Sequence, residues 1–246
     1  MNKALNQVLQ RNDTWLGRHN HFVGSMPPAN NDQYSHSDLS SGYDALDAQL
    51  YQGGWPRGNT IEVLSNGCGM GSMGLFLPAM EALSAQGKWQ AFIAPPYTPY
   101  APLLKARGID TQQVLLIHPR SREDLLWCTE QALRSTTCSA VFSWLGDAEF
   151  RYSELRKLQL AATSSESLAV LFRSDQAAKN HAPAGLRLQM KEYRKVHILK
   201  QHGGNQHLDV TLSPAEDIPG QPQLWELPAH LGSRQQSMAQ AAQMSL

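Results

Sequence analysis

The sequence predicts an α/β fold whose central sheet is mainly parallel and ends in an antiparallel hairpin. Short apolar runs alternate with stretches of helical periodicity from Ser41 to about Leu212, as in βαβ units. The first apolar run, Thr60 to Leu64, leads into a glycine-rich turn, Gly67 to Ser72, and then into a helical stretch. A phosphate-binding loop joins its strand to its helix in this order, which favours the same fold class.

Each element is predicted from its own pattern. Strands are expected where short apolar runs lie between turn residues, at Thr60 to Leu64, Gln90 to Ile93, Val114 to Ile117, Ala140 to Ser143, Ala169 to Phe172, Leu186 to Met190 and Val196 to Lys200. Helices are expected where apolar residues recur at helical spacing, at Met73 to Gln86, Tyr100 to Arg107, Ser121 to Ser135 and Glu149 to Thr163. The turn at His202 to Asn205 lets Leu208 to Leu212 close an antiparallel hairpin.

The chain of 246 residues accommodates one substantial domain with flanking segments. Residues 1 to 40 are expected to hold a short amphipathic helix, Lys3 to Gln10, and a linker rich in Asn, Ser, Pro and Gly. The core is expected to span residues 41 to 213. Residues 214 to 246 are rich in Pro, Gln and Ala with little periodicity, and we expect them to form a mobile tail.

Charge and cysteine content restrict the class of partner and the compartment. Lys plus Arg number 21 and Asp plus Glu number 21, so the net charge gives no overall attraction to nucleic acid or membrane. Any contact with DNA must therefore be local. The sequence has neither a membrane-spanning apolar run nor the pattern of a signal peptide, and we expect a cytoplasmic protein. Cys68, Cys128 and Cys138 lack metal-ligand spacing and suit a reducing compartment.

The run Ser41 to Leu64 resembles the entry to the RecA core, and Gly87 to Ile93, Ala106 to Asp110 and Val114 to Ile117 continue this pattern in register. Four further segments narrow the resemblance to the ImuA family of bacterial proteins by their order and spacing. These segments are Gly53 to Gly58, Ile93 to Pro102, Trp127 to Ser135 and Arg156 to Ala162. ImuA proteins are RecA-related, so the resemblance implies a RecA-like P-loop core. The cell-division inhibitor SulA shares the central part of this pattern, around Gly87 to Ile117.

The resemblance to ImuA also implies a function. ImuA proteins are induced in the SOS response to DNA damage and are associated with mutagenic translesion synthesis. The implied partners are RecA, an ImuB-type Y-family-like protein and the error-prone replicative-type polymerase that works with it. The resemblance to SulA leaves a second function open, which is inhibition of cell division by binding FtsZ.

The groups that hydrolyse ATP in RecA-type sites are missing from their expected positions. The phosphate-loop lysine is replaced by Gly71, so Gly67, Gly69, Gly71 and Ser72 form a degenerate loop in which Ser72 alone offers a hydroxyl. Pro95-Pro96 stands where the water-activating carboxylate should follow a strand, and Trp144 stands at the Walker-B aspartate position. We therefore expect a pseudo-ATPase with no catalytic residue, metal or cofactor. Backbone amides could still hold phosphate, but we favour a structural role for the glycines.

One stretch of the neutral chain is markedly basic. It carries Arg173, Lys179, Arg187, Lys191, Arg194, Lys195 and Lys200. One interpretation is weak contact with single-stranded DNA or with an acidic partner through local charge. The other is a solvated strand edge, where lysines prevent pairing between sheets. The sequence does not separate the two.

Two tryptophans are candidate partner anchors. Trp55 lies in a turn between Gly54 and Pro56, where an aromatic side chain either covers the core or anchors a partner. Trp225 lies in an apolar island, Leu224 to Pro228, within the polar C-terminal segment. Such islands bind partners or fold back on their own domain. For Trp225 we favour binding to a partner. For Trp15, in the N-terminal segment, we favour docking onto the chain's own domain.

Overall fold

One mixed sheet of eight strands organises the described residues, 39–66 and 71–213, of the computed structural model. The strands are β1 (Thr60–Ser65), β2 (Trp89–Ile93), β3 (Val114–Ile117), β4 (Cys138–Gly146), β5 (Leu168–Ser174), β6 (Leu186–Glu192), β7 (Lys195–Gln201) and β8 (Leu208–Thr211). Their order in the sheet is β3-β2-β4-β5-β1-β6-β7-β8. The pairings from β3 to β6 are parallel, and β6, β7 and β8 pair antiparallel. The predicted strands and the antiparallel end of the sheet are therefore confirmed.

Several sequence predictions lie outside the described residues. The chain divides into two units, Met1–Tyr34 and Ser35–Leu246, and every described residue belongs to the second unit. The expected helix at Lys3 to Gln10, the linker, the tail at 214 to 246 and the anchor Trp225 are not described. The same holds for Trp15, Gly67, Cys68 and Gly69. These expectations stay predictions.

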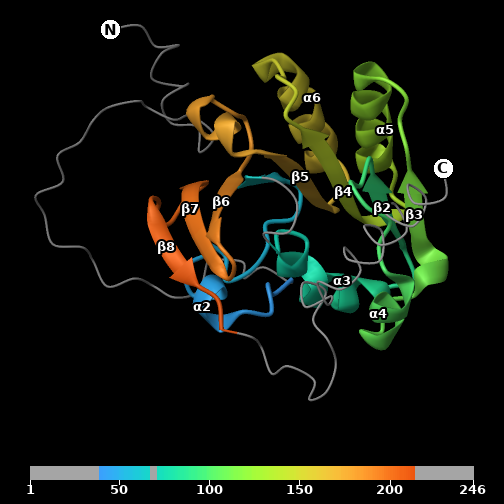
Figure 1. Cartoon of the computed structure of the whole chain (residues 1–246), viewed down its shortest axis with the longest axis horizontal. Helices are drawn as coiled ribbons and strands as arrows, with labels where there is room; N and C mark the ends of the chain where they lie inside the picture. Colours follow the sequence, from blue (N-terminus) through green and yellow to red (C-terminus); the bar gives the residue numbers. More distant parts are fainter. Residues whose placement is uncertain (1–38, 67–70, 214–246) are drawn as a thin grey trace, which may run out of the picture. The chain divides into compact units, whose positions relative to one another are not determined.

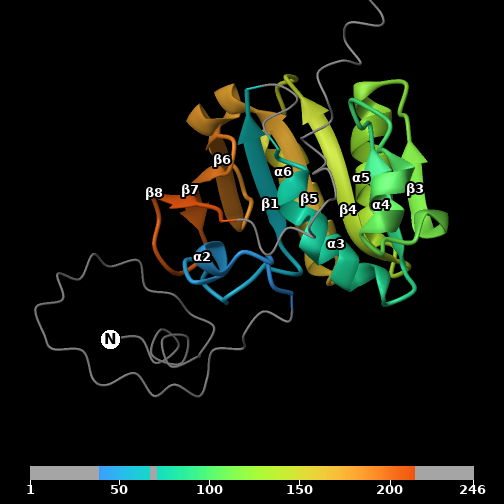
Figure 2. The same cartoon turned by 60° about the horizontal axis from the view of Figure 1, so that its bottom comes forward.

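Helices cover both faces of the sheet, as Figures 1 and 2 show. On one face lie α2 (Asp44–Asp47), α3 (Leu77–Ser84) and α4 (Ala101–Ala106), and on the other lie α5 (Arg122–Arg134) and α6 (Tyr152–Thr163). Short 3₁₀ turns are η1 (Gly74–Phe76), η2 (Thr111–Gln113) and η3 (Asp175–Lys179). Within the described ranges, no helix is long and apolar enough to cross a membrane.

The helix predictions are confirmed with small differences at the ends. The predicted helix at Met73 to Gln86 begins as η1 and continues as α3, in whose first turn Pro78 lies. Proline is accepted there because the first-turn N–H groups have no partner within the helix. The helix α5 begins at a cap, because the Ser121 hydroxyl accepts from the Asp124 N–H at 3.0 Å. The four residues of α2 were not predicted.

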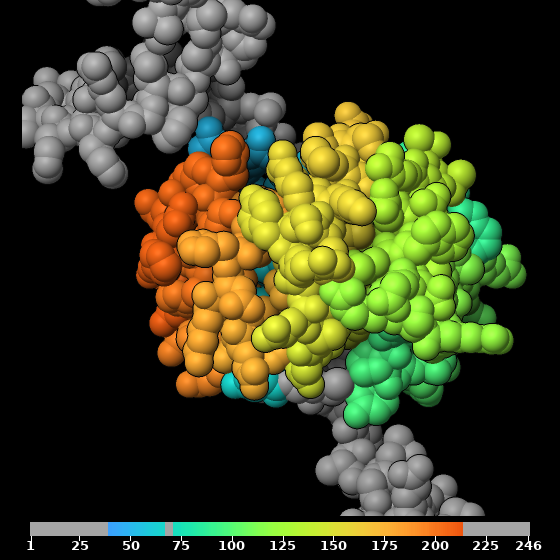
Figure 3. Space-filling model, turned by 90° about the horizontal axis from the view of Figure 1, so that it is seen from above, coloured from blue at the N-terminus to red at the C-terminus, as the bar shows by residue number. Residues whose placement is uncertain are grey.

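An ion pair joins the two helices on the second face. The Arg122 Nη2 atom on α5 lies 2.6 Å from the Glu154 Oε2 atom on α6, and the Arg151 N–H donates to the same carboxylate at 2.8 Å. The hydrogen bond from Arg122 is the largest cause that lowers the pKa of Glu154 from 4.5 to about 2, and the bond from Arg151 comes second. Figure 3 looks onto the face that these helices cover.

Trp55 is part of the hydrophobic core. Its side chain is 0% exposed, and its ring centroid lies 4.6 Å from that of Phe76. Phe76 in turn makes edge contacts with Phe142 of β4 and Phe172 of β5. The turn that carries Trp55 therefore closes the core on the face of α2 and α3. The interpretation of Trp55 as a partner anchor is wrong, because the side chain offers no surface to a partner.

Candidate functional site: an aromatic cavity at the carboxyl ends of the strands

A cavity of about 630 Å³ opens at the carboxyl ends of the parallel strands. Ligands bind at this end of the sheet in α/β proteins, and their pockets typically have volumes of about 300–1,000 Å³. The walls come from the ends of β1, β2, β4 and β5, from the start of η1 and α3, and from the loop between β2 and α4. The sequence predicted a degenerate nucleotide site at this place, and the structure forms a cavity of ligand size there.

Three aromatic side chains on neighbouring strands form one wall of the cavity. Trp144 of β4 stacks on Phe172 of β5 with ring centroids 4.6 Å apart and an interplanar angle of 20°. On its other side Trp144 stacks on Phe92 of β2, at 6.0 Å and 17°. Aromatic rings in parallel strands come into register in this way because side chains two residues apart share a face of the sheet. The wall is therefore apolar.

The loop between β2 and α4 supplies the opposite wall. Pro95 is buried, whereas Tyr97 and Tyr100 are 73% and 52% exposed. The chain turns sharply at Ala94, which has a positive φ of 53° and donates its N–H to the Ile117 carbonyl at 2.8 Å. This turn places the Pro-rich segment over the strand ends. Apolar and aromatic groups thus surround the opening on this side as well.

The predicted loop residues that are described, Gly71 and Ser72, line the cavity. Gly71 has a positive φ of 73°, and a Cβ atom built at this position would lie 3.4 Å from the Tyr193 ring. Asp147 is the one acidic side chain among the lining residues and is exposed at the rim. The polar part of the lining also includes the hydroxyls of Ser65, Ser72, Thr98 and Ser174 and the buried Arg173, which is paired with Glu62. Such a cavity suits an aromatic or aliphatic group with a polar edge.

Two of the predicted contact residues are buried in an ion-pair cluster. Arg173 Nη1 lies 3.0 Å from Glu62 Oε1, and Arg187 Nε lies 2.8 Å from Glu62 Oε2. The Arg187 guanidinium also donates to the carbonyls of Ala177 and Asn180, at 2.7 and 3.0 Å. The side chains of Glu62, Arg173 and Arg187 are 1%, 2% and 8% exposed. The prediction that Arg173 and Arg187 contact DNA or a partner is wrong, because Glu62 holds both inside the protein.

The remaining cations of the basic stretch differ in exposure. Lys179 and Lys191 are exposed, whereas Arg194 and Lys195 are half-buried. Lys200 donates to the Ala182 carbonyl at 3.0 Å, and burial is the main cause that lowers its pKa. A contact with DNA or a partner through Lys179, Lys191, Arg194 and Lys195 stays a prediction.

An aromatic side chain accompanies these cations, which sequence reasoning missed. Tyr193 lies in the turn between β6 and β7, is 43% exposed, and has the Arg194 guanidinium 5.2 Å from its ring centroid. Because Tyr193 also packs at Gly71, this basic turn borders the aromatic cavity. The sequence did contain a signal for this contact, because an aromatic residue, Tyr193, stands among the cations of the basic stretch.

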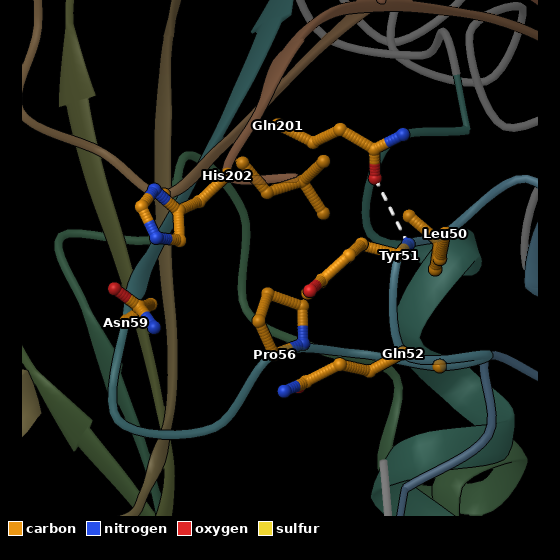
Figure 4. A pocket seen from close by; sticks show the side chains of 10 residues that line it. Leu50, Tyr51, Gln52, Pro56, Asn59, Gln201 and His202 are labelled. Carbon is orange, nitrogen blue, oxygen red and sulfur yellow. Dashed lines mark hydrogen bonds between the residues drawn. The ribbon is translucent and has the colours of Figure 1, made fainter. Parts of the chain in front are cut away.

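A second pocket, at the amino end of β6, has a volume of about 70 Å³ (Figure 4). It is lined by residues that include Tyr51, Asn59 and His202, and Gln201 accepts from the Tyr51 N–H at 3.0 Å. This volume has room for a few waters and is too small for an organic ligand. Among the residues that the structure describes, no group of three metal-ligating side chains occurs.

Exposed apolar side chains lie on both faces of the β3 end of the sheet, with Leu115 on the face that α5 covers and Leu116 on the other. Leu115 and Leu116 of β3 are 41% and 37% exposed, and Trp127 on α5 is 63% exposed. The strand β3 pairs only with β2 among the described residues and therefore leaves one edge unpaired. The sequence predicted the strand and the helix but not the exposure of these side chains. We call Leu115, Leu116 and Trp127 the β3 surface.

Comparison with known proteins shows two similarities. A family model described as cell division inhibitor SulA matches residues 61–169. The cell division inhibitor SulA of Edwardsiella piscicida is 27% identical over 119 residues, which are 48% of this chain and 70% of that protein. Protein RecA of Listeria welshimeri and that of Listeria ivanovii are each 32% identical over 133 residues, which are 54% of this chain and 36% of RecA. The match therefore spans about a third of the RecA length.

Among solved structures, SulA from Pseudomonas aeruginosa is 24% identical, with a TM-score of 0.38, over 46% of this chain and 97% of that one. The comparisons thus support a relation to SulA and RecA.

Proposed function

We propose that this protein is a non-catalytic, RecA-related accessory factor of SOS-induced mutagenic translesion synthesis. It would act by binding RecA and an ImuB-type Y-family-like protein with its error-prone polymerase. The observation that carries the proposal is the aromatic cavity, which stands where a RecA-like P-loop core would hold ATP. Phosphoryl transfer needs charges that stabilise the transferring phosphate. Trp144, Pro95 and Pro96 supply none, and their apolar surface suits a binding role.

ATP hydrolysis is the first test of this proposal. The purified protein is expected to show no ATP turnover above background, with or without single-stranded DNA. Purified RecA serves as the positive control in the same assay. Turnover that Ser72→Ala or Asp147→Asn abolishes would overturn the non-catalytic part of the proposal, because these side chains offer the hydroxyl and the carboxylate at the cavity rim.

The β3 surface is the proposed contact site for a protein partner. An unpaired strand edge offers N–H and C=O groups to an extended segment, and exposed leucine and tryptophan side chains add apolar contact area. The proposal therefore predicts that Leu115→Ser combined with Trp127→Ala, which change the face of the sheet that α5 covers, weakens binding of the partner at least tenfold. Leu160→Ser is a matched control, because Leu160 is 52% exposed and belongs to α6, which covers the same face of the sheet as α5 (Figure 1).

The partner is identified by direct binding of the immobilised full-length chain to purified RecA, ImuB-type protein and FtsZ. Binding of RecA or the ImuB-type protein, lost in the β3 surface variant and kept in Leu160→Ser, supports the proposal. Binding of FtsZ alone would favour the second candidate, a SulA-like inhibitor of cell division. Genetic experiments also distinguish the accessory factor from the inhibitor of cell division. Loss of damage-induced mutagenesis on deletion indicates the accessory factor, whereas filamentation on expression indicates the inhibitor.

The second candidate is supported by the match to the SulA family model over residues 61–169. The strands β6, β7 and β8 lie beyond this segment and add a basic turn and the antiparallel end of the sheet. We favour the accessory factor because these additional elements border the aromatic cavity through Tyr193.

A further inference from the structure

We propose that the aromatic cavity is the binding site for the chain's own C-terminal segment, with Leu224, Trp225 and Leu227 as the apolar anchors. Self-docking takes the place of the partner contact that the sequence favoured for Trp225. The inference concerns how the protein is regulated, and it holds whichever partner the proposed function involves. A seated segment would occupy the cavity at the carboxyl ends of the strands until a competing ligand displaces it. Three observations support this occupant.

The first observation is the place where the described chain ends. The N–H of Leu212, just after β8, donates to the Arg194 carbonyl at 2.7 Å. Arg194 follows Tyr193, whose ring lies against Gly71, and Gly71 lines the cavity. The C-terminal segment therefore begins beside the turn that borders the opening. Trp225 follows Leu212 by 13 residues, which span at most about 45 Å when extended.

The second observation is the chemistry of the two surfaces. The cavity presents Phe92, Trp144 and Phe172 as an apolar wall, with Tyr97 and Tyr100 at the opening. Its volume of about 630 Å³ is far larger than a packing defect and lies within the range of ligand pockets. A tryptophan with a neighbouring leucine is a suitable occupant, because aromatic side chains carry much apolar area and stack at centroid distances of about 4.5–7 Å.

The third observation is complementary charge. Between Pro214 and Pro228 the chain carries Glu216, Asp217 and Glu226 and no lysine or arginine. The turn between β6 and β7 and the strand residues beside it carry Lys191, Arg194 and Lys195, with Glu192 of β6 and Asp209 of β8 as the acids nearby. Opposite charges at the entry orient the segment and favour docking within one molecule, where the linker keeps the local concentration of the segment high.

The test is photo-crosslinking in the full-length protein. Trp225→p-benzoylphenylalanine places a photoreactive aromatic group at the anchor, and Gln236→p-benzoylphenylalanine places the same group at a polar position of the same segment. After irradiation, peptide mapping by mass spectrometry locates the crosslinks. We expect the group at position 225 to react with residues of the cavity, such as Met73, Tyr97 or Phe172, at least fivefold more often than the group at position 236. The product should be monomeric at every protein concentration.

Charge reversal tests the route of the segment independently of the cavity wall. Lys191→Glu combined with Lys195→Glu should lower the crosslinked fraction at position 225 severalfold, and Glu216→Lys with Asp217→Lys in the same chain should restore it. Arg156→Glu with Lys157→Glu, on the exposed face of α6, is the matched control. Equal crosslinking at positions 225 and 236, crosslinks outside the cavity, or crosslinks only between two copies would overturn the inference.

Discussion

Removal of the Glu62 carboxylate should destabilise the protein more than any other single change of charge in the sheet. Glu62 lies on the central strand β1, between β5 and β6, and receives one hydrogen bond from each of two buried arginines. In Glu62→Gln the side chain keeps its shape and loses its charge. Arg173 and Arg187 are then left as two buried cations without a counter-ion. The Arg173 Nε atom has no hydrogen-bond partner among the described residues even before the change.

The expected loss of unfolding free energy follows from this geometry. Breaking a buried ion pair by removing one partner costs about 3–5 kcal/mol, because the other charge stays buried and uncompensated. Two cations lose their partner at once, and the side chains of the cluster are at most 8% exposed. We therefore expect the upper part of this range, about 4–5 kcal/mol, which is a large share of the roughly 5–15 kcal/mol that stabilises a typical domain.

Urea unfolding followed by circular dichroism measures the loss. With a slope of about 2 kcal/mol per M, the midpoint should fall by about 2 M. Glu123→Gln is the control, because Glu123 makes the same type of contact with Arg122 at 3.9 Å while its side chain is 80% exposed. Exposed pairs contribute about 0–1 kcal/mol. If Glu62→Gln and Glu123→Gln shift the midpoint equally, the argument from buried charge is refuted.

Three further predictions concern acid stability, the core and the basic turn. The pKa of Glu154 is lowered in the folded protein to about 2, so its contribution to stability is present above about pH 4.5 and is lost as the pH falls toward 2; Glu154→Gln should flatten the pH dependence of the urea midpoint in that window. Trp55→Ala should cost about 3–5 kcal/mol of unfolding free energy, whereas Trp127→Ala should change it by about 0.5 kcal/mol or less; equal losses in thermal unfolding would contradict the burial of Trp55. Neutralising Lys191, Arg194 and Lys195 should remove any salt-dependent binding of single-stranded DNA, measured by fluorescence anisotropy at two salt concentrations; binding that survives would place the contact elsewhere.

The sheet could be predicted because its signals are local. Parallel strands buried on both faces read as short apolar runs, and each predicted run from Thr60 to Lys200 lies within an observed strand. The ends of the strands were less predictable. The strand at Ala140 to Ser143 extends to Cys138 and Gly146, because the pairing with β5 continues through Trp144. Pairing with a neighbour, which the sequence of one strand does not contain, decides where a strand ends.

The buried ion cluster could not be predicted in the same way because its partners are distant in the chain. Arg173 and Arg187 lie 111 and 125 residues from Glu62. From the sequence alone, both arginines belong to a basic surface stretch. One signal was available, since a glutamate inside the apolar run Thr60 to Leu64 needs a buried cationic partner. That signal indicates that a partner exists and does not identify it.

The position of Trp144 connects the fold to the proposed function. A carboxylate at this position would have to remain charged between Phe92 and Phe172, and an apolar environment would raise its pKa and favour the neutral form. A neutral acid holds magnesium poorly, so Trp144→Asp alone would not create a metal site. A metal site here would require changes at Phe92 and Phe172 as well as at Trp144, because their rings stack on it. The wall around Trp144 is thus a coherent apolar surface, which favours binding of an aromatic or aliphatic side chain over binding of a nucleotide.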